Sequence, residues 1–406
     1  MFPKEFSAGK KGDNVRSDCW VKMKTETGGG RKISLESKVA PLYGRSIKKL
    51  TDDILDHFNI SDCELELNDQ SAFPFVIMAR IESVIRGLGL DKGKKYLPEF
   101  YGSVNDPVRD RQRRSRLYLP GDQPKLFINA GIHLPDGIIL DLEDSVAPDS
   151  KDSARLIVRN ALRAVDFFES ERMVRINQLP LGLRDLEEIV PEKVDLILLP
   201  KIESAEQIKS VSDKIDSIRK SENIKRDVFL MPILESALGI INAYDIASSS
   251  KDIVALAIGL EDYTADIGTK RTDEGRESFY ARSVIVNAAK AAGIQAIDTV
   301  YSDVSNTEGL MASVKEAKSL GFNGKGCIHP RQIKIVHEGF SPGMDEIKKA
   351  RKIVLAYEKA EKEGLGVVSL GSKMIDPPVV KRALQTIEQA LNDSLINENW
   401  REDNEL

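Results

Sequence analysis

The sequence predicts an α/β protein whose main domain is a (β/α)8 TIM barrel, preceded by a small α+β unit. Eight short apolar runs alternate with amphipathic stretches between residues 114 and 330, which is typical of a parallel sheet with crossover helices. Most runs are apolar on both faces, which indicates strands that are covered on both sides. Nearly all of them end in polar or charged residues, as expected where the carboxyl ends of barrel strands form an active site.

Each of the eight runs is short enough for one strand, and helical patterns such as SARLIVRNALRAVDFF separate most of them. The runs are RLYLPG (116–121), GIILDLED (137–144), MVRINQ (173–178), LILLPKIES (196–204), VFLMPILES (228–236), VALAIGLED (254–262), AIDTVYSD (296–303) and GKGCIHP (324–330). An open doubly wound sheet is the alternative, but no G-x-G-x-x-G turn follows the first run.

The first 88 residues form a separate α+β pattern. KISLESKVAPLYGRSIKKLTDDILDHFNI predicts a strand and a helix, and CELELNDQSAFPFVIMARIESVIRGLG predicts strand, turn, strand and helix. We therefore expect a first domain over 1–88, a linker over 89–113 and a barrel over 114–345. The basic run RDRQRR (109–114) predicts a solvated linker.

Composition narrows the function classes. The 406 residues exceed what one core usually serves, and the net charge of −5 favours neither nucleic acid nor an anionic membrane as partner. Three cysteines without paired spacing predict neither disulfides nor a zinc site, and they fit a reducing, cytoplasmic environment. The sequence shows no signal peptide and no apolar stretch long enough to span a membrane.

Two carboxylates at neighbouring strand ends are the first candidates for chemistry. Glu235 ends the fifth run and Asp262 the sixth, and neighbouring strands lie about 4.8 Å apart. Together they could hold Mg²⁺, which takes one or two carboxylates plus water and substrate oxygens. An acid/base pair of the glycosidase type is the alternative. Four histidines without ligand spacing make zinc a poor fit.

Arg175 lies inside the third run, where a guanidinium needs an anion or an enolate as partner. A structural ion pair with a carboxylate at the end of a neighbouring strand is the alternative. His329 of CIHP could orient a ligand, although a hydrogen-bonded core histidine is the more ordinary role.

Many motifs, in order, resemble the citrate lyase β subunit family: RSRLYLPG, ILDLEDSVAP, VRIN, LPKIES, GLEDYTADIG, QAIDTVYSD and GFNGKGCIHPRQI. That family includes citryl-, malyl- and citramalyl-thioester lyases and belongs with the HpcH/HpaI-type aldolases, which are Mg²⁺-dependent TIM barrels. The resemblance implies that Glu235 and Asp262 are the Mg²⁺ ligands and that Arg175 contacts the substrate carbonyl oxygen. It implies that Arg116 lies near the thioester cofactor or the substrate carboxylate, and that Glu143 and Asp144 support the waters of the metal.

The C-terminal stretch GVVSLGSKMIDPPVVKRA is similar to the end of these lyases. The resemblance implies a helix and lid segment over 346–406, often donated by a neighbouring subunit, with Asp376 taking part in proton transfer. It also implies a homo-oligomer.

The N-terminal unit resembles the citrate lyase γ subunit, an acyl carrier protein, through SLESKVAPLYGRSIKKLTDDIL and LELNDQSAFPFVIMARIESVI. In that family a serine before a strand bears a phosphoribosyl-dephospho-CoA arm. Ser17 of RSDCWVKM matches that serine, with Ser7 as a competitor.

The two resemblances together imply a fused carrier and lyase. We expect cleavage of a citryl or citramalyl thioester, bound to carrier or CoA, to oxaloacetate or pyruvate and an acetyl thioester. A separate α-type transferase chain would load the carrier. The alternatives are a malyl- or citramalyl-CoA lyase that uses free CoA and has a vestigial carrier domain, and a non-catalytic carrier or assembly subunit.

Overall fold

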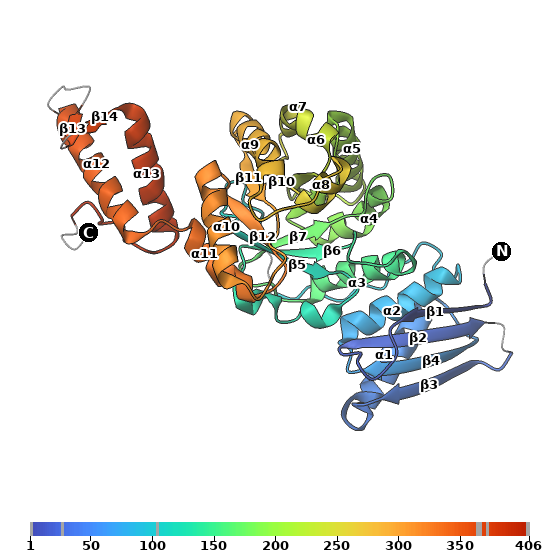
Figure 1. Ribbon diagram of the computed structural model, residues 1–406. Coiled ribbons are helices and arrows are strands. Elements are labelled where there is room, and N and C mark those ends of the chain that lie inside the picture. The colour runs from blue at the N-terminus through green and yellow to red at the C-terminus, as the bar shows by residue number, and fades with distance from the viewer. Residues whose placement is uncertain (1–2, 26–27, 103–104, 363–367, 371–372, 403–406) are drawn as a thin grey trace. The chain divides into compact units, whose positions relative to one another are not determined.

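The N-terminal unit is a four-stranded sheet with two helices packed against it (Figure 1). The computed structural model describes residues 3–25, 28–102, 105–362, 368–370 and 373–402. The sheet order is β1-β2-β4-β3, in which β3 and β4 are parallel and the other pairs antiparallel. Its elements are β1 (Glu5–Gly9), β2 (Asp18–Thr25), β3 (Arg31–Ser37), α1 (Ala40–His57), β4 (Cys63–Gln70) and α2 (Pro74–Gly87).

The second strand predicted within CELELNDQSAFPFVIMARIESVIRGLG is wrong, because that segment is helix α2. Pro74 stands in the first turn of the helix, where its missing N–H costs nothing and its fixed φ suits the helix. Residues 75–85 of α2 are all buried except Met78. A helix that is buried on nearly every side lacks the amphipathic pattern that would have identified it.

The barrel of eight parallel strands is confirmed, and the open sheet is excluded. The strands close in the order β10-β11-β12-β5-β6-β7-β8-β9, and the barrel interior is packed with apolar side chains such as Ile139, Leu198 and Met231. The strands are β5 (Ser115–Pro120), β6 (Gly137–Asp141), β7 (Glu171–Arg175), β8 (Leu196–Leu199), β9 (Phe229–Leu234), β10 (Ala255–Ile258), β11 (Gln295–Asp298) and β12 (Gly324–Cys327).

Helices surround the barrel and connect its strands (Figure 1). They are α3 (Lys151–Ala164), α4 (Gly182–Ile189), α5 (Ala205–Ser221), α6 (Ala237–Ile241), α7 (Ala243–Ser248), α8 (Leu260–Asp266), α9 (Arg276–Ala291) and α10 (Thr307–Leu320). Helix α11 (Arg331–Phe340) follows the last barrel strand in sequence. Four short 3₁₀ helices lie at Pro124–Leu126, Ala130–His133, Pro148–Ser150 and Val190–Glu192.

The basic run before the barrel is exposed at Arg109 and Asp110 but not at Arg113, so the prediction of a solvated linker is wrong for the end of the run. Arg113 is 1% exposed and donates two hydrogen bonds of 2.7 Å to the buried carboxylate of Glu171 on β7. Arg109 and Arg111 donate to backbone carbonyls of the barrel, among them those of Ile253 and Asp136. The run therefore ties the chain to the barrel through charge-assisted hydrogen bonds.

Residues 334–406 form a second compact unit. It contains α12 (Met344–Lys362), β13 (Val368–Leu370), β14 (Lys373–Ile375) and α13 (Pro377–Asn392). Helices α12 and α13 pack together around an apolar core that includes Ile347, Val354 and Ile387.

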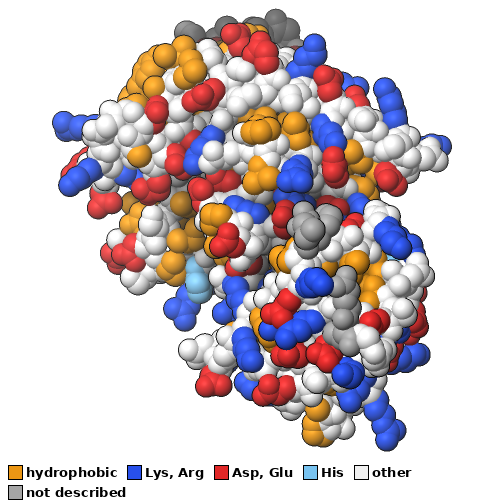
Figure 2. Space-filling model, turned by 90° about the vertical axis from the view of Figure 1, so that its right-hand side faces the viewer, with side chains coloured by type: hydrophobic (Ala, Val, Ile, Leu, Met, Phe, Trp, Pro, Cys, Tyr) orange, Lys and Arg blue, Asp and Glu red, His pale blue; other side chains and the backbone are white. Residues whose placement is uncertain are grey.

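No helix in the described part of the chain is long and apolar enough to cross a membrane. On the face drawn in Figure 2, acidic and basic side chains are interspersed. This mixture matches the small net charge of −5.

Candidate active site

A cavity of about 380 Å³ opens at the carboxyl end of the barrel strands, the end at which barrel enzymes carry their active sites. Charged side chains from several strands and from α8 line this cavity. They are Arg116, Asp141, Asp144, Arg175, Glu235, Glu261, Asp262 and Asp298. Five of the sequence-predicted residues thus line one cavity: Arg116, Asp144, Arg175, Glu235 and Asp262.

Glu235 follows the last residue of β9 and is 5% exposed. Its side chain lies directly over Gly259 at the end of β10, where a Cβ would approach the Glu235 Cγ to 2.7 Å. Glycine at 259 therefore leaves the room that the carboxylate occupies. Among the described residues, Glu235 Oε2 has no hydrogen-bond partner, which is costly for a buried polar atom.

Asp262 lies in the first turn of α8, beside Glu235. Burial first, and then the negative charge of Asp262, raise the pKa of Glu235 to about 8. Lys201 places its Nζ 3.4 Å from Asp262 Oδ1. The carboxylates of Glu235 and Asp262 therefore lie side by side, and the buried one, Glu235, has an oxygen without a hydrogen-bond partner in the described structure.

This donor set fits a hard divalent cation. Mg²⁺ takes one or two carboxylates and fills its remaining positions with water and substrate oxygens, and a cation would meet the unpaired Oε2 of Glu235. Within the described ranges no cluster of three or more His, Cys, Asp or Glu side chains could hold a metal. A site made of these two carboxylates therefore needs oxygens from solvent or substrate.

Arg175 ends β7 and is held by carboxylates of the neighbouring strand. Its Nε and Nη2 donate to Asp141 at 2.6 and 2.7 Å, and its Nη1 lies 3.0 Å from Glu143 Oε2. Burial would raise the pKa of Asp141, but the hydrogen bonds and charge of Arg175 outweigh it and lower that pKa. The structural ion pair considered from sequence is therefore present, and the guanidinium also lines the cavity.

Glu143 and Asp144 differ in their surroundings. Glu143 is buried, accepts a 3.0 Å hydrogen bond from Gln178 Nε2 and pairs with Arg175. Asp144 is 57% exposed and lines the cavity near Lys201. Burial, followed by a hydrogen bond to Glu143 and its charge, raises the pKa of Asp144.

Arg116 lies inside the barrel, 1% exposed, and lines the floor of the cavity. Its Nη1 lies 3.0 Å from Met231 Sδ and its Nη2 donates weakly to the carbonyl of Asp298 at 3.5 Å. Burial lowers its pKa. In the described part of the chain, its Nε has no partner, so this guanidinium is available to an anionic group of a ligand.

Sequence reasoning missed three residues of the site. Asp141 pairs with Arg175 in the β6–β7 register, Lys201 reaches Asp262, and the ring of Tyr118 lies 5.3 Å from the Arg175 guanidinium. Asp141 was detectable as the first acid of DLED, directly after an apolar run. Lys201 also ends an apolar run, whereas nothing in the sequence distinguished Tyr118.

The remaining predicted residues lie outside this cavity's lining. Asp376 is exposed at the start of α13, where its carboxylate accepts a 3.1 Å hydrogen bond from the Val379 N–H. His329 is half-buried and accepts a hydrogen bond from the Arg331 N–H. Ser17 immediately precedes β2 with a φ of 55°, and Ser7 lies exposed within β1.

Comparison with known proteins assigns the family. Residues 114–330 match the model of HpcH/HpaI aldolase/citrate lyase. Residues 11–88 match an acyl-carrier model described as malonate decarboxylase delta subunit.

Named relatives agree with this family. The citrate lyase subunit beta of Haemophilus influenzae is 43% identical over 281 residues, which cover 68% of this chain and 97% of that protein. The mitochondrial citramalyl-CoA lyase of Homo sapiens is 35% identical over 290 residues, covering 68% of this chain and 85% of that protein.

A solved structure is similar as well. The protein CitE of Mycobacterium tuberculosis, in complex with magnesium, acetoacetate and coenzyme A, aligns with a TM-score of 0.57 at 30% identity. The alignment covers 70% of this chain and 99% of that one. The resemblance and the enzyme class predicted from sequence are confirmed: this chain belongs to the HpcH/HpaI aldolase/citrate lyase family of carbon–carbon lyases and carries an acyl-carrier-like unit at its N-terminus.

Proposed function

We propose that the chain is an Mg²⁺-dependent lyase that cleaves a citryl or citramalyl thioester into a 2-oxo acid and an acetyl thioester. The observation that carries the proposal is the pair Glu235 and Asp262 in the cavity beside Arg175, with the buried Oε2 of Glu235 unpartnered in the described structure. The relatives named citrate lyase subunit beta and citramalyl-CoA lyase support this substrate class. The magnesium complex of the similar solved structure supports the metal.

Glu235 and Asp262 would hold the cation. When bound, Mg²⁺ supplies charge neutralisation and fixed geometry for the oxygens of the reacting group. These two carboxylates would therefore also orient the substrate, because the positions they leave open are filled by its oxygens.

Residues of the chain would then stabilise the negative charge that develops on the substrate and bind its anionic groups. A base takes the proton of the substrate hydroxyl, the bond between the carbinol carbon and the CH₂ next to the thioester carbonyl breaks, and a 2-oxo acid and a thioester enolate form. Arg175, fixed by Asp141, would donate hydrogen bonds to oxygen as negative charge develops there. Arg116 would contact an anionic part of the ligand from the cavity floor.

Asp376 would return a proton to the enolate carbon and complete the acetyl thioester. Its carboxylate accepts a hydrogen bond from the Val379 N–H at the start of α13. We propose that it acts from a lid segment, in this chain or in a neighbouring copy of a homo-oligomer.

The N-terminal unit would act as the carrier of the thioester, with Ser17 as the attachment site of a phosphoribosyl-dephospho-CoA arm. A separate α-type transferase chain would exchange acyl groups on that arm. A lyase that uses free CoA thioesters is the second candidate, which the similarity to the citramalyl-CoA lyase favours.

A cleavage assay tests the proposal. The purified chain with Mg²⁺ is given citryl-, citramalyl- and malyl-CoA separately, and the 2-oxo acid released is identified. We expect turnover of one thioester, abolished by a chelator, restored by Mg²⁺ and lost in Asp262→Asn. Unchanged Mg²⁺-dependent turnover in Asp262→Asn would contradict the site. Cleavage only after the native arm is loaded favours the carrier, and full activity of Ser17→Ala on free thioesters favours the second candidate.

A further inference from the structure

The N-terminal unit is joined to the barrel through helix α2, which is packed on two sides. Ile77, Ile81 and Val84 face the core of its own sheet. Val76, Ala79 and Ser83 are also buried but do not belong to that core, and their spacing places them on one stripe of the helix. Helix α2 packs against α3 of the barrel, and small side chains on this stripe allow the two helices to approach closely.

Helix α3 is buried in the same way. Every residue from Ala154 to Leu162 is buried, because one side of α3 covers the barrel and the other receives α2. The layer between α2 and α3 is buried, and its polar side chains are hydrogen-bonded across it, for example Asn160 Nδ2 to the carbonyl of Phe75 at 3.0 Å. A carrier that leaves its enzyme in each cycle would have to break these buried contacts every time, which costs free energy.

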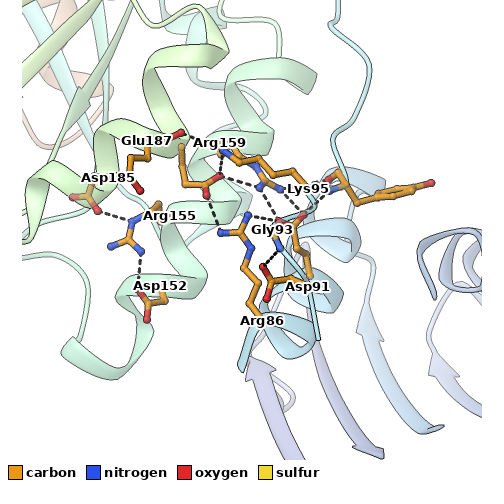
Figure 3. A network of polar contacts seen from close by, with 12 residues as sticks. Arg86, Asp91, Gly93, Lys95, Asp152, Arg155, Arg159, Asp185 and Glu187 are labelled. Atoms are coloured by element: carbon orange, nitrogen blue, oxygen red, sulfur yellow. Dashed lines mark hydrogen bonds and ion pairs between the residues drawn. The ribbon is translucent and has the colours of Figure 1, made fainter. Parts of the chain in front are cut away.

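Buried ion pairs set the register of this layer (Figure 3). Arg159 of α3 donates two hydrogen bonds, of 2.8 and 2.7 Å, to Glu82 of α2, and both side chains are 0% exposed. Glu188 of α4 binds Arg159, Arg86 and Lys95 from α3, α2 and the linker. Breaking such a pair would leave a buried charge without a partner, which is strongly destabilising, so these pairs oppose separation of the two domains.

Two contacts determine which end of the barrel the carrier loop faces. Lys10, in the loop between β1 and β2 that ends at Ser17, lies 2.6 Å from Asp122, just beyond the carboxyl end of β5. Asp18 is buried against Arg80, which donates to Ser153 in the first turn of α3. Helix α3 begins next to the end of β6, because Lys151 binds the carbonyl of Leu142. Both contacts place the Ser17 loop at the end of the barrel that holds the cavity.

We infer that the N-terminal unit is a fixed carrier: it stays docked on α3 and α4, presents Ser17 at the active-site end, and delivers the thioester by movement of the arm alone. This inference rests on the proposed function for the thioester, but the docking itself stands on the contacts above. A fixed carrier keeps the arm at high effective concentration over the cavity of its own chain.

Linker cleavage tests the docking without any enzyme assay. A site-specific protease sequence is inserted between Gly102 and Asn105 of the full chain, cut, and followed by size-exclusion chromatography with light scattering. We expect both pieces to elute together at physiological salt and at about 1 M salt, where charges are screened within ~3 Å. Separation of the pieces at either salt concentration would overturn the inference.

A reducible cross-link tests the consequence for turnover. A short bis-maleimide that contains a disulfide joins the cysteines of the variant Lys10→Cys/Asp122→Cys. The native Cys19, Cys63 and Cys327 are buried, so the reagent should not modify them. Each single-cysteine variant is the matched control. The locked chain should turn over its carrier-bound thioester as fast as after reduction. Loss of turnover that reduction restores would mean that the carrier must undock. If the unlocked chain cleaves no thioester, the proposed function fails, and the co-elution result still decides the docking.

Discussion

At the scale of single residues, the pair Arg175 and Asp141 controls where the guanidinium points. Asp141→Asn keeps the shape of the side chain but removes the charge that accepts from Arg175 at 2.6 and 2.7 Å. We expect kcat to fall by about a hundredfold, the cost of a displacement near 1 Å at a reacting group, with a smaller change in KM. Steady-state kinetics on the cleaved thioester would measure this, and wild-type kcat in Asp141→Asn would refute a positioning role.

Gly259 should be needed for metal binding although it has no side chain. A Cβ at this position would meet Glu235 Cγ at 2.7 Å and Cδ at 2.8 Å, so Gly259→Ala must displace the carboxylate. We expect Mg²⁺ affinity to fall by about 10- to 100-fold, as when a group that orients a ligand is changed. Titration calorimetry measures it. Gly343→Ala, whose Cβ meets nothing within 4 Å, is the control; an equal loss in both variants would contradict the explanation.

Some residues of the site were predicted from the sequence and others were missed, and the difference has a physical reason. Glu235 and Asp262 were found because each follows an apolar run, and parallel strands bring such ends together. Asp141 was passed over in favour of Glu143 and Asp144, because one strand end offered three acids and only the β6–β7 register selects the one opposite Arg175. Pairing between strands is not encoded in any single strand.

At the scale of elements, the barrel was predictable and the segments that leave it were not. Each barrel strand is an apolar run with its own turn signals, whereas the role of RDRQRR depends on a partner 58 positions away, Glu171. A charged run has the same composition whether water or a buried carboxylate receives it. The N-terminal part of helix α2 was predicted as a strand for a related reason. Because the helix is buried on two sides, its sequence lacks the helical alternation of apolar and polar residues.

The Arg113–Glu171 pair should be a strong structural contact of that segment. Arg113→Met leaves a carboxylate buried without its partner, since the two side chains are 0% and 1% exposed. We expect a loss of about 3–5 kcal/mol in the free energy of unfolding. Arg113→Met with Glu171→Leu should recover most of it, because both charges are then gone. Denaturant titrations would measure this, with exposed Arg16→Met as the control; a double variant no better than the single one would contradict it.

At the scale of the whole molecule, one chain combines a carrier-like unit, a lyase barrel and a C-terminal helical unit. Motifs identified the first two separately, since each unit has its own pattern of apolar residues. How the carrier meets the barrel was not predictable, because it depends on residues such as Glu82, Arg159 and Glu188 that look like solvated helix positions in sequence. Their pairing becomes visible only when α2 and α3 are placed side by side.

This pairing should make the carrier–barrel contact sensitive to acid. Burial alone would raise the pKa of Glu188, but Arg86 and Arg159, followed by Lys95, outweigh it and lower the pKa to about 2 from an ordinary value of 4.5. Since the folded pKa lies below the unfolded one, the contribution is fully present above pH 4.5 and is lost as pH falls toward about 2. A shift of this size corresponds to roughly 3 kcal/mol of stability at neutral pH.

Comparison with Glu188→Gln isolates this contribution from that of other carboxylates. Denaturant midpoints of the wild-type chain and the variant are measured from neutral pH down to about pH 2. The advantage of the wild-type chain should be constant above pH 4.5 and should shrink steadily below it, because protonated Glu188 resembles glutamine. A difference that persists unchanged into acid would show that the charge of Glu188 does not hold the two domains together, and that apolar packing between α2 and α3 does so alone.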